Sequence, residues 1–447
     1  MMNDNKKIGW IVLIVVAILA GAMLVGSVMS GAFDSLQVAT ELIVTLVIFL
    51  AVVLVLLGAL LWVTLFAKDK TEAIHTNAFN APTESPTNEG RFCMLSEIDE
   101  RKDEYSHKSY DSEITLAKIC EDFRSYAANE LGLYYEIDDI RKFIAGLSVS
   151  KLLILQGMSG TGKTSLAHAF GSYLDNPSTV IPVQPMWKER TDLIGYYNEF
   201  TKKFNETLLL RKMYEANDSE DMYITVLDEM NIARVEYYFA EFLSLLELPD
   251  AEERYLNIVS DRWESDPQGL VDGRIKLPKN MWFIGTANND DSTFSISDKV
   301  YDRAMVLDLN KRSEPFFAPE TERLHLSAER FEELTAGAVH ENAVSQRNEK
   351  RLYELDEYLK EHFHVTFGNR IMKQIRTYVP VYISCGGEEL EALDDLLSKK
   401  VIRKLDMQNP IYLKSSAGKL IDYLDELFGK DQMPLCKERI RRIERNA

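Results

Sequence analysis

The sequence is poor in cysteine, with four in 447 residues, and no two of them stand at the Cys-x-x-Cys spacing typical of zinc sites. Such wide spacing also argues against a disulfide framework and agrees with a reducing compartment. His362 and His364 form the only close pair among the seven histidines, and nothing nearby supplies the remaining ligands of a metal site. We therefore expect neither zinc nor disulfides at the cysteines, which are Cys93, Cys120, Cys385 and Cys436.

The sequence is also short of positive charge, because 51 lysines and arginines face 70 aspartates and glutamates, for a net charge of −19. An acidic surface repels phosphate backbones and anionic lipid head groups, so it disfavours non-specific binding to either. Internal repeats and low-complexity tracts are absent from the sequence as well. Direct binding to nucleic acid is therefore not expected.

Two long, almost uncharged runs, residues 8–29 and 42–67, stand near the start of the chain. Each exceeds the roughly 20 residues that a helix needs to cross a bilayer core. A secretory signal peptide is the alternative for the first run, but the length of the run and the second run soon after it weaken that interpretation. Residues 1–67 are thus predicted to form a transmembrane hairpin in the lipid bilayer, a multi-pass anchor. By the positive-inside rule, flanking lysines place the N-terminus and the rest of the chain in the cytoplasm: Lys6, Lys7, Lys68 and Lys70.

The remainder divides into three parts by composition. Residues 68–111 are polar, contain Pro82 and Pro86, and lack sustained periodicity, which predicts a flexible cytoplasmic linker that couples the parts on either side only loosely. Residues 112–312 alternate between apolar, β-branched runs and helical spacing, as a doubly wound parallel α/β sheet does. Residues 313–447 are predicted to form a connecting segment and a mostly helical lid domain.

Two stretches within these parts carry local signals. Ser112 is predicted to cap a helix, because apolar residues between Leu116 and Leu131 share one helical face. By contrast, Pro315 and Pro319 interrupt the segment 313–349, and the sequence assigns that segment no clear role.

The strongest signal in the core is "KLLILQGMSGTGKTSLAHAF", residues 151–170. An apolar strand is followed by Gly-x-x-x-x-Gly-Lys-Thr and then by a helix, which is the full phosphate-loop pattern in its required context. In such a loop, glycines let backbone N–H groups surround phosphate oxygens, and the helix N-terminus adds partial positive charge. Lys163 is expected to reach the β- and γ-phosphates, and Thr164 to help hold Mg²⁺. The predicted nucleotide-binding residues are Gly157, Met158, Ser159, Gly160, Thr161, Gly162, Lys163, Thr164 and Ser165.

Two adjacent carboxylates, Asp228 and Glu229, follow the predicted strand 223–227. Taken alone, they also fit an ordinary strand-to-helix turn with an acidic helix start. With a nucleotide in the phosphate loop, Asp228 is expected beside Mg²⁺ and Glu229 beside the water that attacks the γ-phosphate. The predicted strand 281–285 leads to Asn288, which is expected in the same crevice beside the γ-phosphate.

These motifs, in this order, resemble the AAA+ ATPases, and "LDEMNIAR" and "IGTANNDDS" resemble the McrB-like and MoxR-like branch of that family. The segments "ERYLNIV" and "LVDGRIKLP" are similar to the two strands of a β-hairpin that this branch carries. The resemblance covers residues 131–309. It implies an AAA+ P-loop fold and hydrolysis of ATP with Mg²⁺ in a homo-oligomeric ring, expected to be a hexamer. The residues that carry it are Asp228, Glu229, Asn231, Ala233, Asn288 and Asp291.

The resemblance also implies an arginine that reaches the nucleotide of a neighbouring subunit. Arg303 in "SISDKVYDRAMVLDL" fits this place, although Ala304 and Met305 depart from the Arg-Arg-Phe ending that is commoner in the family. A surface arginine paired with Asp302 is the alternative. In "VTFGNRIMKQIRTYV", a segment similar to the start of a lid helix, Arg370 is the candidate for an arginine that reaches the nucleotide of the same chain, and an ordinary helix-start residue is the alternative.

Residues 186–204, "MWKERTDLIGYYNEFTKKF", resemble a place in the family where an insert faces the central pore. Trp187, Tyr196 and Tyr197 are candidates to grip a polypeptide there. Aromatic side chains more commonly pack against the core, and packing is the favoured expectation.

The favoured function is a membrane-anchored ATPase whose ring remodels a partner molecule, with a protein of unknown identity as the expected partner. Two alternatives stay open. One is an McrB-like motor subunit that acts on nucleic acid through a partner nuclease in a defence system. The other is a nucleotide-gated membrane scaffold with slow hydrolysis. The sequence does not decide between ATP and GTP as the nucleotide.

Overall fold

The computed structural model describes residues 90–105, 109–288, 293–311 and 313–446. Three predictions concern residues outside these ranges: the transmembrane hairpin of residues 1–67, the first part of the linker, and the position of Asp291. Within the described ranges, no helix has both the length and the apolar character needed to cross a membrane.

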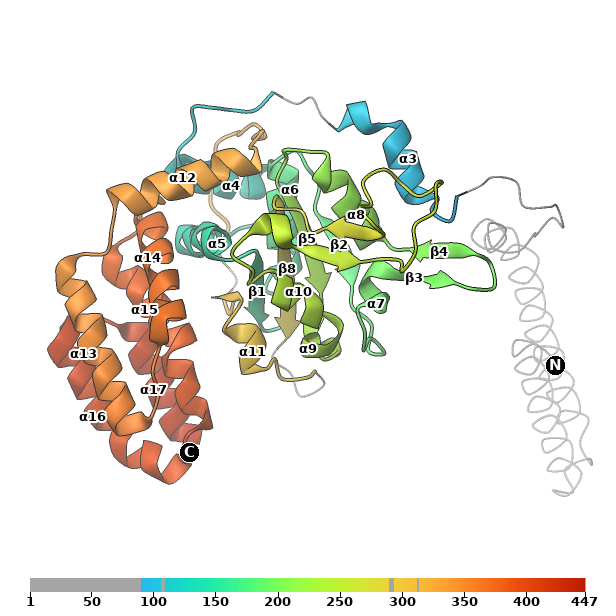
Figure 1. The fold of residues 1–447 in the computed structure, drawn as a ribbon. Coiled ribbons are helices and arrows are strands. Elements are labelled where there is room, and N and C mark those ends of the chain that lie inside the picture. The colour runs from blue at the N-terminus through green and yellow to red at the C-terminus, as the bar shows by residue number, and fades with distance from the viewer. Residues whose placement is uncertain (1–89, 106–108, 289–292, 312, 447) are drawn as a thin grey trace, which may run out of the picture. The chain divides into compact units, whose positions relative to one another are not determined.

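A parallel sheet of five strands forms the centre of the described part of the chain (Figure 1). Its strand order is β2-β5-β8-β1-β9, and every neighbouring pair is parallel. Nearly every residue of the three central strands is buried, which explains why their sequences are continuous apolar runs. The predicted parallel α/β sheet is thus confirmed. Its strands are β1 (Leu152–Gly157), β2 (Thr179–Pro182), β5 (Tyr223–Asp228), β8 (Met281–Asn288) and β9 (Met305–Asp308).

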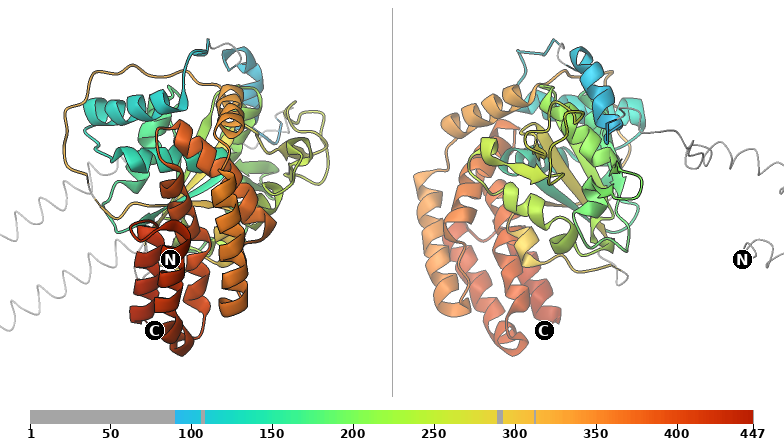
Figure 2. Two further views of the ribbon diagram at one scale, coloured as in Figure 1. Left: turned by 90° about the vertical axis from the view of Figure 1, so that its left-hand side faces the viewer. Right: turned by 45° about the vertical axis from the view of Figure 1, so that its right-hand side comes forward.

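Helices cover both faces of this sheet (Figure 2). Successive strand residues point to opposite faces, so Leu153 belongs to one apolar core while Leu152 and Ile154 belong to the other. The first core is closed by α4 (Leu116–Leu131), α5 (Ile137–Val149) and α6 (Lys163–Tyr173). The second is closed by α7 (Thr191–Ile194), α8 (Leu208–Asn217), α9 (Val235–Tyr238) and α10 (Ala240–Leu245).

One local prediction is wrong. Helix α4 is capped by Thr115, whose hydroxyl accepts a hydrogen bond from the Lys118 amide at 3.2 Å, and not by Ser112. The segment after Asp228 is not one continuous helix, because Asn231 ties the chain to the end of β8 and a short 3-10 turn comes first. The segment is therefore divided into η2 (Met230–Ile232), α9 and α10.

Two short antiparallel hairpins lie outside the main sheet. β6 (Tyr255–Asn257) pairs with β7 (Arg274–Lys276), which confirms the pairing predicted for the segments "ERYLNIV" and "LVDGRIKLP". β3 (Gly195–Asn198) pairs with β4 (Lys203–Glu206), and this hairpin overlaps residues 186–204, for which a pore-facing insert is the less favoured of two expectations.

Residues 90–105, the N-terminal strap, form helices that pack against the second apolar core. The prediction that the linker is flexible up to residue 111 is therefore wrong for this part of it. The strap contains α3 (Met94–Glu100) and η1 (Lys102–Glu104). The Glu206 carboxylate of β4 accepts hydrogen bonds from three consecutive amides at the start of α3, at 2.7, 2.9 and 2.8 Å: Cys93, Met94 and Leu95.

Arg91 fastens the strap from its other side. Its side chain is almost fully buried and forms a 2.7 Å ion pair with Asp266 and a 3.2 Å pair with Asp261. Its guanidinium also lies 4.5 Å from the centre of the Trp263 ring. Burial alone would make this charge costly, and the two carboxylates compensate for it. The backbone joins in as well, because the Phe204 amide of β4 donates to the Arg91 carbonyl at 2.8 Å.

We expect Glu206→Gln to loosen the strap selectively. The amide keeps the size of the side chain but removes the charge and one acceptor, which costs about 1–2 kcal/mol for amide groups bonded to a carboxylate. Hydrogen exchange at Met94 and Leu95 should accelerate about tenfold, because 1.4 kcal/mol is a factor of ten. Glu199→Gln, at the exposed turn of the same hairpin, is the matched control. Equal exchange in both variants would contradict the role of Glu206.

After β9 the chain runs without helix or strand through residues 313–326 and then continues as helices only. This agrees with a mostly helical lid, and it shows that the segment 313–349 includes helix α12 after its two prolines. The helices are α12 (Ala328–Glu341), α13 (Gln346–Phe363), α14 (Gly368–Ser384), α15 (Glu389–Lys400), η4 (Ile402–Met407), α16 (Pro410–Phe428) and α17 (Pro434–Asn446).

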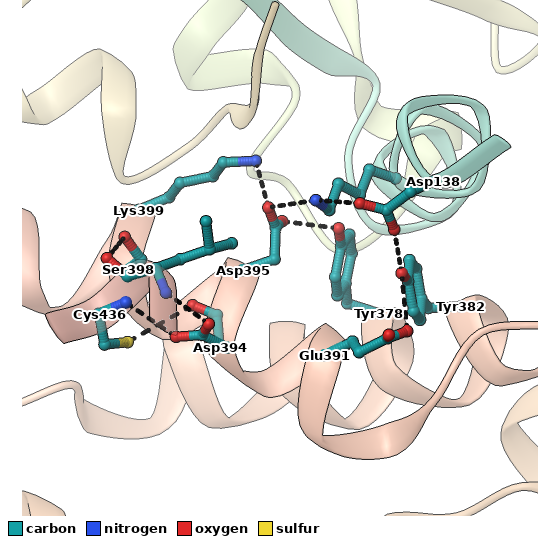
Figure 3. A network of polar contacts seen from close by, with 11 residues as sticks. Asp138, Tyr378, Tyr382, Glu391, Asp394, Asp395, Ser398, Lys399 and Cys436 are labelled. Atoms are coloured by element: carbon teal, nitrogen blue, oxygen red, sulfur yellow. Dashed lines mark hydrogen bonds and ion pairs between the residues drawn. The ribbon is translucent and has the colours of Figure 1, made fainter. Parts of the chain in front are cut away.

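Helix α14 packs against core helix α5, and a buried polar network fixes their contact (Figure 3). Tyr378 and Lys399 both donate to the carboxylate of Asp395, at 2.8 and 2.6 Å, and Tyr382 donates to Asp138 of α5. A buried carboxylate is costly unless it is paired, and these donors supply the partners. Specific polar contacts therefore join the lid helices to the sheet layer.

Candidate functional site

The loop between β1 and α6 has the backbone shape of a phosphate site. Gly162 immediately precedes α6 with a φ of 88°, in the left-handed region that favours glycine. Gly157 has a φ of 150°, and a Cβ there would lie 2.3 Å from the carbonyl oxygen of Leu309. Both positions thus require glycine for backbone reasons. The first N–H groups of α6 have no partner inside the helix and are available to an anion.

Lys163 is folded over this loop. Its ammonium donates to the carbonyl oxygens of Gly157 at 3.1 Å and Met158 at 2.8 Å, and only 7% of the residue is exposed. The loop backbone thus positions the charge of Lys163 directly beside the amides that follow it. Positive charge and inward N–H groups at one place suit a polyphosphate.

Thr164, Asp228 and Thr286 meet at the carboxyl edge of the sheet. The Thr164 hydroxyl donates to Oδ1 of Asp228 at 2.6 Å, and the Thr286 hydroxyl donates to the same oxygen at 2.9 Å. Hydroxyl and carboxylate oxygens are the ligands that Mg²⁺ prefers, and the ion usually takes only one or two from the protein. The two predicted metal residues, Thr164 and Asp228, therefore lie together and fit Mg²⁺. Within the described residues, no cluster of three or more histidine, cysteine or acidic side chains offers a different metal site.

Glu229 is held in place by its backbone. Its φ is 53°, which is uncommon for a residue other than glycine and occurs often at functional sites. Its amide donates to the Thr286 hydroxyl at 2.8 Å, while its side chain is exposed at the edge of the sheet. Thr286, for which the sequence predicts no role, connects Asp228 and Glu229 through one hydroxyl.

Asn288 lies opposite Gly157 in the register of β8 and β1, so it borders the phosphate loop as predicted. The side chain of Asn231 fixes it there: the Asn231 amide donates to the Asn288 carbonyl at 2.9 Å and to the Phe294 carbonyl at 3.2 Å. Asn231 is therefore a structural connector between the Glu229 turn and the end of β8.

Arg303 and Arg370 lie together at the opposite, amino edge of the sheet. Arg303 pairs with one oxygen of Glu247 at 2.8 Å, and Arg370 pairs with the other at 2.5 Å. Together with Ser150, the three side chains line an open cavity of about 770 Å³. Ser150 lies two residues before the start of β1. Arg303 therefore pairs with Glu247 and not with Asp302, the alternative partner considered from the sequence.

The prediction for Arg370 changes with this placement. Arg370 does not approach the phosphate loop of its own chain, because α14 packs on α5 and brings the start of α14 to the amino edge. The expectation that it contacts the nucleotide of the same chain does not hold in this arrangement. Arg303 lies at the same edge, away from its own phosphate loop, and its action on a neighbouring subunit stays a prediction.

Among the aromatic residues of segment 186–204, some pack against other rings and some are exposed to solvent. Trp187 packs against Tyr238 with ring centres 5.5 Å apart, and Tyr197 packs against Trp263 at 6.1 Å. For these two the favoured expectation of packing is confirmed. Tyr196 is exposed, and Phe200 at the turn of the hairpin is 98% exposed.

Comparison with known proteins identifies the central part of the chain. Residues 152–304 match the family model described as AAA domain (dynein-related subfamily), and residues 322–447 match a domain of unknown function (DUF8727). Among curated proteins no match was found. Among solved structures, the crystal structure of a candidate ATPase from Cytophaga hutchinsonii is similar, with 13% sequence identity and a TM-score of 0.43, over 69% of this chain and 88% of the other.

The first match agrees with the resemblance to AAA+ ATPases, because residues 152–304 include the phosphate loop and the strands that lead to Asp228 and Asn288. The place of this chain in the McrB-like or MoxR-like branch stays a prediction.

Proposed function

We propose that the AAA domain of this chain hydrolyses ATP with Mg²⁺ in a ring of identical subunits, and that the ring is anchored to a membrane and remodels a partner molecule. The observation that carries the proposal is the separation of the catalytic groups. The phosphate loop follows the carboxyl end of β1, whereas Arg303 lies beside Ser150 at its amino end. A six-residue strand spans about 20 Å at roughly 3.3 Å per residue. Arg303 therefore serves a nucleotide only if that nucleotide belongs to another copy.

The residues at the carboxyl edge then divide the chemistry among them. Lys163 binds the β- and γ-phosphates, and Thr164 and Asp228 hold Mg²⁺, which neutralises charge on the phosphate oxygens when it is bound. Glu229 orients the attacking water and accepts its proton. Asn288 positions the γ-phosphate from the neighbouring strand.

The two arginines at the amino edge form the complementary half of the site. In the described chain they share Glu247, which neutralises part of their charge. In a ring, the phosphates of a neighbouring subunit would replace Glu247 as their partner, because a guanidinium binds phosphate through two parallel hydrogen bonds. Arg303 supplies the charge that stabilises the transition state, and we extend the proposal to Arg370 as a second contact.

The membrane anchor and the partner rest on sequence. Support for the anchor comes from the two apolar runs at 8–29 and 42–67 and from the lysines that flank them. Support for a protein partner rather than a nucleic acid comes from the net charge of −19.

Mixing two inactive variants of the full chain tests the shared site. We expect Arg303→Ala to lower turnover about 10³-fold, as loss of an arginine finger does, and Glu229→Gln to be similarly inactive. When the two are mixed in detergent, an Arg303→Ala subunit receives Arg303 from its Glu229→Gln neighbour, so phosphate release should reappear. Activity that stays absent in the mixture, or turnover by a monomer that does not depend on concentration, would contradict the proposal.

A further inference from the structure

Residues 298–304, the short segment that carries Arg303, have little secondary structure of their own. Helix α11 (Asp298–Tyr301) has a single turn, and the amides that follow it bond back into that turn: the Asp302 amide to Asp298 at 2.8 Å and the Arg303 amide to Val300 at 3.1 Å. A helix leaves its last carbonyl groups without partners of its own, and a one-turn helix has little else to stabilise it. The position of Arg303 therefore depends on which groups bind these carbonyls.

Side chains bind all four consecutive carbonyls from residue 301 to residue 304. The ammonium of Lys400 donates to the carbonyl of Tyr301 at 2.6 Å and also to that of Ala304. Gln374 donates to the carbonyl of Asp302 at 3.3 Å, and the Ser150 hydroxyl donates to that of Arg303 at 2.9 Å. Two of the three donors, Lys400 of α15 and Gln374 of α14, belong to the lid.

Lys400 is an unusual residue at its position. It ends α15 with only 2% of its surface exposed, and burial lowers the pKa of its ammonium to about 7. A buried apolar side chain would avoid this cost, so the lysine is explained best by its two bonds. Those bonds bracket Arg303, with one carbonyl on each side of it.

A third lid residue, Arg403, contacts the same segment, and Tyr301 connects that segment to the phosphate loop. The Arg403 guanidinium lies 4.1 Å from the centre of the Tyr301 ring and 2.7 Å from Asp298. The Tyr301 hydroxyl donates to Gln156 at 2.9 Å, and Gln156 directly precedes Gly157. The Arg303 segment is thus placed between the lid on one side and the start of the phosphate loop on the other.

We propose that Lys400 is a positioning residue for Arg303: through the carbonyls of Tyr301 and Ala304 it makes the presentation of this arginine to the neighbouring subunit depend on the docked lid. The inference rests on the proposed function, in which Arg303 acts on a neighbour. The lid of one subunit then contributes to the active site of the next subunit, in addition to any contribution to the active site of its own subunit.

Mixed rings of the full chain separate this role from a general loss of stability. The reference mixture contains Glu229→Gln subunits, which donate Arg303, and Arg303→Ala subunits, which hydrolyse. Adding Lys400→Met to the donor should lower the phosphate release of the mixture by about tenfold or more, because misplacement of a catalytic group by about 1 Å costs up to about 10²-fold. Adding Lys400→Met to the Arg303→Ala subunit instead should change the rate less than about twofold, since that subunit has no arginine to position.

Lys437→Met in the donor is the matched control. Lys437 of α17 is also buried, but it bonds to the Lys430 carbonyl at 2.7 Å and to Asp425, both within the lid and outside the network that joins α14 to α5. We expect this variant to support the reference rate. Equal losses from Lys400→Met in either subunit, or equal losses from Lys437→Met and Lys400→Met in the donor, would show a merely structural lysine and overturn the inference alone. A reference mixture without activity would overturn the proposed function, and the inference with it.

Discussion

Glu229→Gln is expected to abolish most ATP turnover while nucleotide binding persists. The amide keeps the length of the side chain and the left-handed turn at φ 53°, and the backbone bond to Thr286 does not involve the side chain. Only the ability to accept a proton from water is lost, and a positioned general base contributes about 10²–10⁴-fold. Steady-state phosphate release and titration with a fluorescent ATP analogue measure the two properties separately.

Glu236→Gln provides the comparison, because it removes one carboxylate from α9 a short distance along the same segment. Its turnover should stay within about twofold of the unmodified chain. Full activity of Glu229→Gln would exclude Glu229 as the base, whatever the control shows. Weakened binding in Glu229→Gln would indicate instead that the carboxylate helps to hold the metal.

Lys163→Ala is expected to weaken nucleotide binding itself. A hydrogen bond from an ammonium to a phosphate contributes about 1.5–3 kcal/mol, so the dissociation constant should rise roughly 10- to 100-fold. Turnover at saturating ATP should fall as well, since the same charge stabilises the transition state. Titration of the purified full chain with the fluorescent analogue measures the first effect.

The variant also removes two bonds inside the loop, to the carbonyls of Gly157 and Met158. Thr161→Ala tests that side effect, because the Thr161 hydroxyl bonds to the same Met158 carbonyl at 3.0 Å and carries no charge. A small change in Thr161→Ala beside a large change in Lys163→Ala assigns the loss to the charge. Equal losses in the two variants would assign it to distortion of the loop.

The site at the carboxyl edge was predictable because its residues follow local rules. Gly157, Gly162 and Lys163 stand at fixed spacing between a strand and a helix, and parallel strands bring their carboxyl ends to one edge. Asp228 and Asn288 therefore had to meet the phosphate loop once the strands were recognised. The connecting roles of Thr286 and Asn231 require the register of β5 and β8, which a single sequence does not supply.

The features that the sequence did not predict depend on contacts between distant parts of the chain. The N-terminal strap has only Phe92, Leu95 and Ile98 at helical spacing, a run too short to distinguish a helix from a polar linker, and its partners Glu206 and Asp266 lie more than 100 residues away. The location of Arg370 follows from the docking of α14 on α5, which no local pattern encodes. Lys400 reads as an ordinary basic residue at a helix C-terminus, and only the folded chain shows which carbonyls it binds.

The attachment of the N-terminal strap determines where mechanical load enters the protein. Tension on the chain that precedes residue 90 first reaches Arg91 and Glu206, and these residues transmit it to the β3–β4 hairpin and to the loop around Asp266. The same contacts also act in the opposite direction. The turn of the β3–β4 hairpin carries the exposed Phe200, and any displacement of this hairpin is transmitted to the N-terminal strap through the bond between Phe204 and Arg91.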